Sequence, residues 1–322
     1  MASKKKYTSY EICAGAGGQA LGLELAGFQH IGILEIEPLA CQTLLLNRPE
    51  WNVIQADVRE LHLNDYNGQI DLLAGGVPCP PFSKAGKQLG HLDERDLFPD
   101  AIRLVRECNP KAILLENVKG LLEPKFDQYR QNILTELQEL GYVCDWQLLN
   151  ASDYGVSQLR PRAILIGLKK EYYQYFQWPS PRKKKPVSVG TLLYEEMSSM
   201  GWTGAIKWKR RAKRIAPTLV GGSKKHGGAD LGPTRAKQAW LQLGVDGGGV
   251  ANTPPTMDFE GTPKLTLSMT ALIQGFPREW QFAGSKTPAY RQIGNAFPPP
   301  VAKAVGIALI KALKYGDKTK KK

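Results

Sequence analysis

Cysteine is scarce in this chain of 322 residues, and no two of its cysteines are spaced as a pair. The five are Cys13, Cys41, Cys79, Cys108 and Cys144, and none belongs to a C-x-x-C motif. An odd number of well-separated cysteines argues against a disulfide framework and against a zinc site. We therefore expect no bound metal and a reducing, cytoplasmic location.

Long apolar runs are also missing. No stretch approaches the roughly 20 apolar residues that a membrane-spanning helix needs. The basic start of the chain leads into Tyr7–Glu11 rather than into the apolar segment of a secretory signal. We expect no membrane association.

Acidic residues are outnumbered by basic ones. The chain has 43 Lys and Arg against 30 Asp and Glu, giving a net charge of +13 and a pI near 9.4. This excess is typical of proteins that bind a polyanion such as nucleic acid. The alternative is a soluble protein with solvated basic ends such as Lys318–Lys322.

The first half alternates short apolar runs with amphipathic stretches, which indicates an α/β fold with a mostly parallel sheet. Candidate strands are Tyr10–Cys13, His30–Glu35, Ile70–Ala74, Ala112–Glu116 and Ala163–Leu168. Candidate helices are Ala20–Ala26, Pro38–Leu46, Phe98–Arg106 and Asn132–Leu140, the last ended by Gly141.

The amino-acid composition and the apolar pattern change after Leu168. Residues 169–263 are rich in glycine, tryptophan and clustered basic residues, densest in Lys207–Arg214. A compact apolar pattern returns from Lys264 and ends in a predicted helix, Val301–Leu313. We predict a catalytic and cofactor-binding domain (1–168), an irregular basic domain (169–263), and a C-terminal segment (264–322) that completes the catalytic domain.

A glycine-rich turn, Ala14–Gly18, follows the first candidate strand and opens a helix. Glycines there allow close backbone approach to a ligand. Glu35 lies about twenty residues on, where a carboxylate reaches ribose hydroxyls in nucleotide-binding folds, and Asp57 follows the next apolar segment. The spacing is not G-x-G-x-x-G, which favours an adenosyl ligand over a dinucleotide; the alternative is a turn with no ligand.

Cys79 follows a strand that ends in two glycines, and Pro78 and Pro80 flank it. Because proline fixes φ, the thiol is presented in one defined position. Cysteine is more often a buried structural residue. This one, however, stands where ligand sites form in α/β folds.

Two further segments carry polar residues next to strands. Glu116 ends an apolar strand and is predicted to face the same site as Cys79, as an acid, or else to cap the next helix. Arg160 and Arg162 precede another apolar strand. At alternate positions of an extended segment they point to one side, where guanidinium groups suit phosphate or a base carbonyl. A solvated strand edge is the alternative.

These motifs together resemble the bacterial DNA cytosine-5 methyltransferases of type II restriction–modification systems. The family's ordered motifs run along nearly the whole chain: the glycine turn, Pro78–Cys79, Glu116–Val118, Gln158–Arg162, Leu265–Thr266 with Gln274–Pro277, and Tyr290–Asn295. Two departures stand out. Cys13 replaces the family's usual phenylalanine, and Pro80 replaces its usual glutamine.

The resemblance implies an S-adenosylmethionine-dependent methyltransferase (Rossmann-like) fold, with helices on both faces of the sheet and a small irregular target-recognition domain at 169–263. It implies that Cys79 adds to carbon 6 of a flipped-out cytosine, with Glu116 donating to N3, Arg162 bonding O2 and Arg160 supporting them. The methyl donor is S-adenosyl-L-methionine and the product S-adenosyl-L-homocysteine. The implied cofactor contacts are Ala14, Gly15, Ala16, Gly17, Gly18, Glu35, Ile36, Asp57, Val58, Pro78, Leu97 and Asn295.

Double-stranded DNA is the implied partner. Ser83, Lys87 and Gln88 fall in a segment that resembles the family's mobile loop, although an ordinary surface loop has the same composition. Thr218 belongs to a threonine–leucine signature in the recognition region. Arg210, Arg211, Lys224 and Lys225 are candidate DNA contacts there, either to bases or non-specifically to phosphates. We expect a monomer in a prokaryotic cytoplasm, functionally paired with a restriction endonuclease without a stable complex.

Two other functions remain open. Relatives that methylate tRNA cytosine carry a further cysteine motif in the recognition region, whereas no cysteine follows Cys144 here. A catalytically inactive DNA-binding relative would be expected to have lost Cys79, Glu116 or Arg162.

Overall fold

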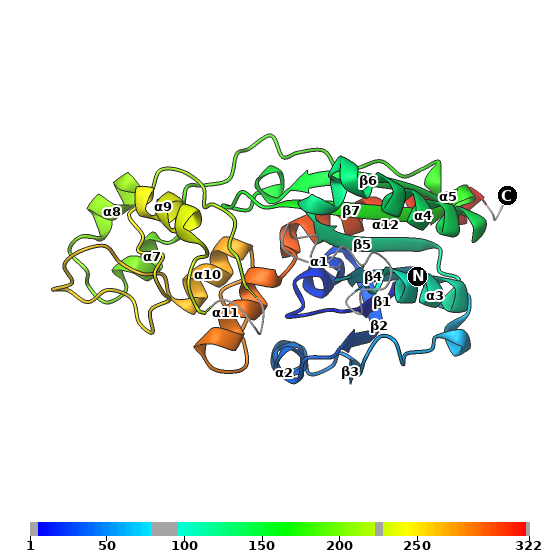
Figure 1. The fold of residues 1–322 in the computed structure, drawn as a ribbon, viewed down its shortest axis with the longest axis horizontal. Helices are drawn as coiled ribbons and strands as arrows, with labels where there is room; N and C mark the ends of the chain where they lie inside the picture. The colour runs from blue at the N-terminus through cyan, green and yellow to red at the C-terminus, as the bar shows by residue number, and fades with distance from the viewer. Residues whose placement is uncertain (1–5, 79–95, 223–227, 320–322) are drawn as a thin grey trace, which may run out of the picture. The chain divides into compact units, whose positions relative to one another are not determined.

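The structure, a computed structural model, describes residues 6–78, 96–222 and 228–319 (Figure 1). The chain divides into two compact units. Unit 1 comprises Met1–Leu149, Pro161–Ser180 and Ala302–Lys322, and unit 2 comprises Asn150–Arg160 and Pro181–Val301. These limits differ from the predicted three-part division, since residues 264–301 group with unit 2; the functional roles assigned to the three parts stay predictions.

In the described residues a seven-stranded sheet has the order β3-β2-β1-β4-β5-β7-β6. Its strands are β1 (Tyr7–Ile12), β2 (Phe28–Glu35), β3 (Val53–Gln55), β4 (Leu72–Gly76), β5 (Ala112–Val118), β6 (Tyr142–Asn150) and β7 (Pro161–Lys169). The pairings of β1 with β2 and β4, of β2 with β3 and of β4 with β5 are parallel. β7 runs antiparallel to β5. The strand order reverses between β1 and β4, which is where ligands bind in open α/β sheets.

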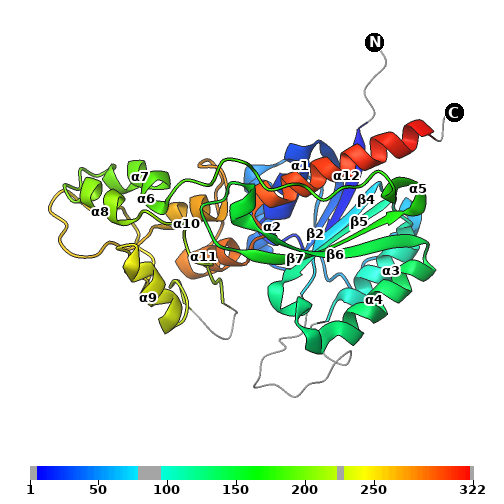
Figure 2. The same ribbon diagram turned by 90° about the horizontal axis from the view of Figure 1, so that it is seen from above.

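Helices cover both faces of the sheet (Figure 2), which confirms the predicted fold class. They are α1 (Gly18–Ala26), α2 (Pro38–Asn47), α3 (Phe98–Cys108), α4 (Asp127–Glu139), the short α5 (Lys170–Tyr173) and α12 (Pro299–Thr319). Apolar residues of α3 and α4 share one buried cluster with the strands. On the other face α12 lies close against α1, since a Cβ on Gly306 would stand 2.8 Å from the Cβ of Ala26.

The ends of α3 follow from its sequence. Pro99 stands in the first turn, where its missing N–H costs nothing, and Asp100 lies near the positive end of the helix dipole. Arg106 lies in the last turn, and Asn109 ends the helix with φ +44°. Asparagine is one of the few non-glycine residues that adopt this left-handed backbone readily. These residues account for where α3 begins and ends.

Unit 2 is built of short helices joined by loops. The helices are α6 (Val189–Leu192), α7 (Tyr194–Ser198), α8 (Ala205–Arg211), α9 (Thr234–Gln242), α10 (Leu267–Gln274) and α11 (Lys286–Asn295). Trp202, Trp208 and Trp240 are buried in one cluster, and the Trp208 indole donates to the Gly244 carbonyl at 3.0 Å. The region predicted to be irregular therefore has an ordered aromatic core.

One stretch of the described residues, Lys286–Thr319, is long and apolar enough by composition to span a membrane, which the sequence analysis did not expect. Most of its apolar window is buried within the fold, as in the core helices of soluble proteins. The stretch is also interrupted between α11 and α12. It is therefore weak evidence for a membrane span.

Candidate functional site

The glycine turn after β1 is held in a left-handed backbone. Cys13, Gly15 and Gly17 have φ of 51°, 55° and 81°, and the Ala14 N–H donates to Leu34 O of β2 at 3.1 Å. Among the described residues, and apart from Gly15 and its two chain neighbours, no heavy atom lies within 4 Å of the place that a Cβ on Gly15 would take. The turn thus leaves open space beside its backbone at the point where α1 begins.

Glu35 lies at the end of β2 and faces this turn. Its Oε2 accepts the Gly15 N–H at 2.6 Å and its Oε1 the Glu37 N–H at 2.8 Å. Burial raises the pKa of Glu35, although these hydrogen bonds oppose the shift. Next to it, Ile36 exposes 53% of its surface. A buried carboxylate, an exposed apolar side chain and an open turn suit an adenosyl ligand.

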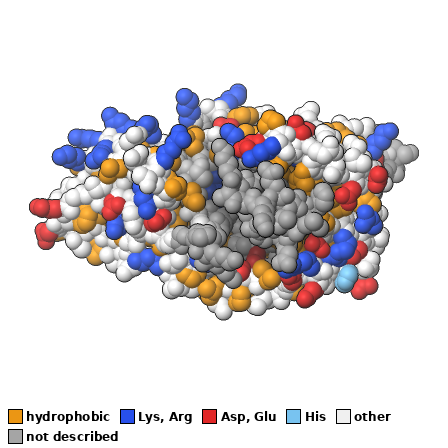
Figure 3. Space-filling model, viewed as in Figure 1, with side chains coloured by type: hydrophobic (Ala, Val, Ile, Leu, Met, Phe, Trp, Pro, Cys, Tyr) orange, Lys and Arg blue, Asp and Glu red, His pale blue; other side chains and the backbone are white. Residues whose placement is uncertain are grey.

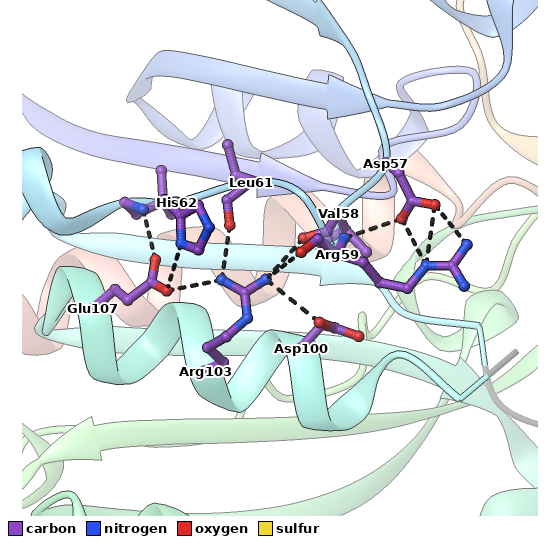
Figure 4. Close-up of polar contacts among 9 residues, drawn as sticks. Asp57, Val58, Arg59, Leu61, His62, Asp100, Arg103 and Glu107 are labelled. Atoms are coloured by element: carbon purple, nitrogen blue, oxygen red, sulfur yellow. Dashed lines mark hydrogen bonds and ion pairs between the residues drawn. The ribbon is translucent and has the colours of Figure 1, made fainter. Parts of the chain in front are cut away.

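Asp57 and Val58 follow β3 (Figure 4). The Asp57 carboxylate accepts from the Arg59 backbone N–H and from its Nε, both at 3.0 Å. The Arg59 guanidinium lowers the pKa of Asp57, which keeps the carboxylate charged. Val58 is buried. An ionised acceptor thus stands on the loop where the adenine was predicted.

The end of β4 is tied to both neighbouring segments. The Asn117 amide donates to the Val77 carbonyl at 2.8 Å, and the Leu97 N–H donates to Pro78 O at 3.4 Å. A Cβ on Gly76 would lie 3.5 Å from Glu116 Oε2. Cys79, Ser83, Lys87 and Gln88 lie outside the described residues. The chain before that segment is bonded to Asn117, and Pro78 and Leu97 on its two sides are bonded to each other.

The four described cysteines are poor thiolates. Burial raises the pKa of Cys41 to about 11 and those of Cys108 and Cys144 to about 12. Burial also raises the pKa of Cys13, and the carboxylates of Glu35, Asp57, Asp100 and Glu11 add to the shift. In the described part of the chain, therefore, no cysteine is a ready nucleophile at neutral pH.

Glu116 pairs with Arg162 across the antiparallel strands β5 and β7. Arg162 Nε lies 2.7 Å from Glu116 Oε1, and both side chains are almost buried. The contact is a nearly buried ion pair. Burial lowers the pKa of Arg162 and the Glu116 charge opposes this. The structure thus brings together two of the predicted catalytic residues.

Arg160 has different surroundings within unit 2. Its side chain is fully buried and donates to three backbone carbonyls, those of Leu219 at 2.8 Å, Gly294 at 2.7 Å and Ala296 at 3.0 Å. β7 begins at Pro161, so Arg160 precedes the strand. Arg160 and Arg162 thus have different partners, and the shared role assigned to them from their spacing stays a prediction.

The predicted residues of unit 2 differ in exposure. Arg210 and Arg211 lie at the end of α8, where Lys and Arg side chains gather on the surface (Figure 3). The Thr218 hydroxyl donates to the Leu159 carbonyl, and Asn295 donates to Gly222 O at 3.4 Å. Lys224 and Lys225 lie outside the described residues. The DNA contacts and the cofactor contact of Asn295 stay predictions.

Sequence reasoning did not single out Asn117 or Gln158 for their packing roles. Gln158 is buried, donates to Gln274 Oε1 at 2.7 Å and accepts the Leu219 N–H at 2.8 Å. Both residues belong to recognised motifs, yet their partners lie far along the chain. In the sequence, only their position inside these motifs indicated that Asn117 and Gln158 have a structural role.

Comparison with known proteins gives a consistent picture. A model of the C-5 cytosine-specific DNA methylase family matches residues 7–311. The chain is 59% identical over 312 residues to the type II methyltransferase M.NgoMIV of Neisseria gonorrhoeae, covering 96% of this chain and 99% of that protein. It is 55% identical over 309 residues to the type II methyltransferase M.NaeI of Lentzea aerocolonigenes, covering 94% and 74%.

Solved structures are similar in fold. A structure described as a DNA modification methyltransferase encoded within an E. coli prophage aligns with TM-score 0.68 and 23% identity, covering 96% of this chain and all of that one. A DNMT2 mutant of Spodoptera frugiperda aligns with TM-score 0.66 and 18% identity, covering 95% of this chain and all of that one. At these identities the similarity shows the fold alone.

Proposed function

The chain belongs to the C-5 cytosine-specific DNA methylase family and is an S-adenosylmethionine-dependent DNA cytosine-5 methyltransferase of the type II restriction–modification class, and we propose that Cys79 is its covalent nucleophile. The four described cysteines are thiols at neutral pH, because burial raises each pKa. Cys79 directly follows Pro78, which is exposed. A basic, partly exposed environment favours the thiolate that this chemistry needs.

The observation that carries the proposal is the Glu116–Arg162 ion pair beside the end of β4. Glu116 pairs in register with Gly76, three residues before Cys79. Asn117 holds the intervening Val77 by its carbonyl. A carboxyl group and a guanidinium are thus placed together close to the chain that presents the thiol.

The cytosine ring does not react with a methyl donor by itself. Carbon 5 of cytosine is a poor nucleophile until a thiolate adds to carbon 6 and converts the ring into an enamine. Glu116 donates a proton to N3 as charge builds on the ring, and Arg162 hydrogen-bonds O2. S-adenosylmethionine, when bound, supplies the electrophilic methyl group that carbon 5 takes up. Water then removes the carbon 5 proton, and Cys79 leaves by elimination.

Glu116 faces Arg162 before any substrate is present, which favours its carboxylate form. Cytosine binding draws the guanidinium toward O2 and so releases Glu116 from its ion pair. The released Glu116 carboxylate takes up a proton from solvent, and the resulting carboxyl group donates that proton to N3. Substrate binding and acid activation are coupled through one ion pair.

The cofactor residues fit the structure of unit 1. The Ala14–Gly18 backbone would lie along the ligand, and Glu35 would accept hydrogen bonds from the ribose hydroxyls. Asp57 would accept a hydrogen bond from the adenine amino group. Ile36 and Val58 would make apolar contacts with the adenine. Pro78 and Leu97 flank the reacting end, while Asn295 stays a prediction from the resemblance.

The substrate is double-stranded DNA, and the target cytosine is flipped out because a stacked base is inaccessible. The recognition residues lie in unit 2, among Arg210, Arg211 and Thr218, with Arg160 as a positioning residue. Ser83, Lys87, Gln88, Lys224 and Lys225 complete the DNA contacts. The enzyme acts as a cytoplasmic monomer that protects DNA from a restriction endonuclease, with which it forms no stable complex.

Covalent trapping tests this function. Duplex DNA with 5-fluorocytosine in place of cytosine blocks the last step, because carbon 5 carries no proton to remove. With S-adenosylmethionine, the wild type and the Cys144→Ser control should form a complex that survives denaturing electrophoresis. Cys79→Ala should form none; trapping by Cys79→Ala would overturn the assignment.

A further inference from the structure

Two side chains of α3 bind the backbone of the loop that follows β3, residues 57–63 (Figure 4). Arg103 donates to three carbonyls, those of Leu61 at 2.7 Å, Val58 at 3.0 Å and Arg59 at 3.4 Å. Glu107 Oε2 accepts the Leu63 N–H at 2.7 Å. These side-chain hydrogen bonds satisfy backbone groups of the loop and hold its backbone against α3.

The two side chains also hold each other. They stand four residues apart on α3, and Arg103 Nη1 lies 2.8 Å from Glu107 Oε1. Burial would raise the pKa of Glu107, but hydrogen bonds from the Leu63 N–H, Arg103 and His62 outweigh it and lower the pKa. Both groups are largely shielded from solvent, with 27% and 12% of their side chains exposed. We call this pair the α3 clamp.

The clamp determines where Asp57 and Val58 stand. The carbonyl of Val58 is itself one of the three that Arg103 holds. Asp57 precedes it directly, and its carboxylate is oriented by Arg59, whose carbonyl Arg103 also binds. Residues 57–63 contain no helix or strand. Their own backbone bonds are two turn bonds, from the Glu60 N–H to Asp57 O at 3.1 Å and from the Leu61 N–H to Val58 O at 3.3 Å, so the loop should loosen without the clamp.

We propose that Arg103 and Glu107 are positioning residues that set the enzyme's selectivity for adenine in its cofactor. The inference rests on the proposed adenine contacts of Asp57 and Val58. The clamp touches no part of the ligand; it fixes the acceptor that reads the 6-amino group. Loss of the α3 clamp should therefore reduce the preference for adenine over other purines more than it reduces the affinity for the cofactor.

The chain contains a matched control. Arg130 of α4 likewise donates to two loop carbonyls, those of Leu121 at 2.6 Å and Glu123 at 3.2 Å. It also pairs with a carboxylate of its own helix, Asp127. Its loop follows β5 and carries none of the proposed adenine contacts. Arg130→Gln thus removes the same kind of bonds elsewhere in unit 1.

The experiment measures Kd by calorimetry for S-adenosylhomocysteine and for its inosine analogue, which lacks the 6-amino group. A hydrogen bond to a charged acceptor is worth about 1.5–3 kcal/mol, so the wild type should prefer adenine by roughly ten- to 150-fold. Arg103→Gln should reduce this preference to about threefold or less, Arg103→Lys should restore part of it, and Arg130→Gln should keep it. Glu107→Gln, which keeps an oxygen acceptor, should reduce it less than Arg103→Gln.

The outcomes separate the two claims. A wild type that binds both ligands equally would refute the adenine role of Asp57, and with it the proposal. A wild-type preference that Arg103→Gln retains in full would overturn the clamp alone. If Arg103→Gln does not fold, Glu107→Gln decides: an unchanged preference in that variant contradicts the proposal.

Discussion

The Glu116 carboxylate and the Arg162 guanidinium form an ion pair, with Oε1 and Nε 2.7 Å apart. Their strands pair antiparallel, and Arg162 stands opposite Val118, two residues from Glu116. Such diagonal neighbours on one sheet face are within reach of long side chains. The ion pair holds together the two side chains that we propose as the acid and the ligand of the base carbonyl.

The stability losses of the two single variants of this pair should not add in the double variant. Glu116→Ala leaves a buried guanidinium without its counter-charge, which typically costs about 3–5 kcal/mol of unfolding free energy. Urea denaturation should show Glu116→Ala/Arg162→Met to be less destabilised than the sum of the single variants. Both singles and the double should lack methylation activity. Strictly additive losses would contradict the coupling.

Asn117 should control how the nucleophile is presented. Asn117→Asp keeps the shape but loses the amide donor to Val77 O, two residues before Cys79. The loss of one buried hydrogen bond costs about 1–2 kcal/mol of stability. Covalent trapping on 5-fluorocytosine DNA should slow by about tenfold or more. Asn132→Asp, at an exposed site of α4, should trap at the wild-type rate, and equal rates for both variants would argue against the anchor.

Arg160 should affect DNA binding more than cofactor binding. Its three carbonyl partners all lie in unit 2, and lysine cannot reproduce the planar fork that reaches them. Fluorescence anisotropy should show Arg160→Lys binding DNA at least about tenfold more weakly. Calorimetry should show a smaller loss of S-adenosylhomocysteine binding, because two of the carbonyls belong to Gly294 and Ala296, which flank the predicted cofactor contact Asn295. A parallel loss of both would indicate general unfolding instead.

Cofactor affinity should depend on pH through Glu35. Burial raises its pKa above that of an ordinary glutamate, which is about 4.3. Ribose hydroxyls donate to the carboxylate form, so binding favours the ionised group and weakens as pH falls through the raised pKa. The Kd for S-adenosylhomocysteine should therefore increase between pH 7 and pH 5. Glu35→Gln should bind more weakly at pH 7 and show a flatter profile; an unchanged slope would exclude Glu35 as the source.

The sequence predicted those features that depend on local pattern. The strand end at Glu35 was placed correctly, and the strand that carries Glu116 was found although it continues to Val118, because buried parallel strands appear as continuous apolar runs. The turn at Ala14–Gly18 was recognisable because glycine is the residue that adopts a left-handed backbone at no cost. Motif order then identified the family.

Features that depend on chain pairing were not predictable. The antiparallel direction of β7 brings Arg162 to Glu116, and nothing in an apolar run reveals its direction. Arg160 was grouped with Arg162 by spacing, whereas its partners are carbonyls of Leu219, Gly294 and Ala296, more than fifty residues away in the chain. The α3 clamp was equally hidden, since Arg103 and Glu107 resemble an ordinary exposed helical pair.

The most direct test of the central claim is bisulfite sequencing of plasmid DNA recovered from cells that express this chain. The account predicts that cytosines within one short sequence are protected from conversion, and that expression of Cys79→Ala leaves the same cytosines unprotected. Protection that persists in Cys79→Ala, or no protection from a folded wild type that binds S-adenosylhomocysteine, would contradict it.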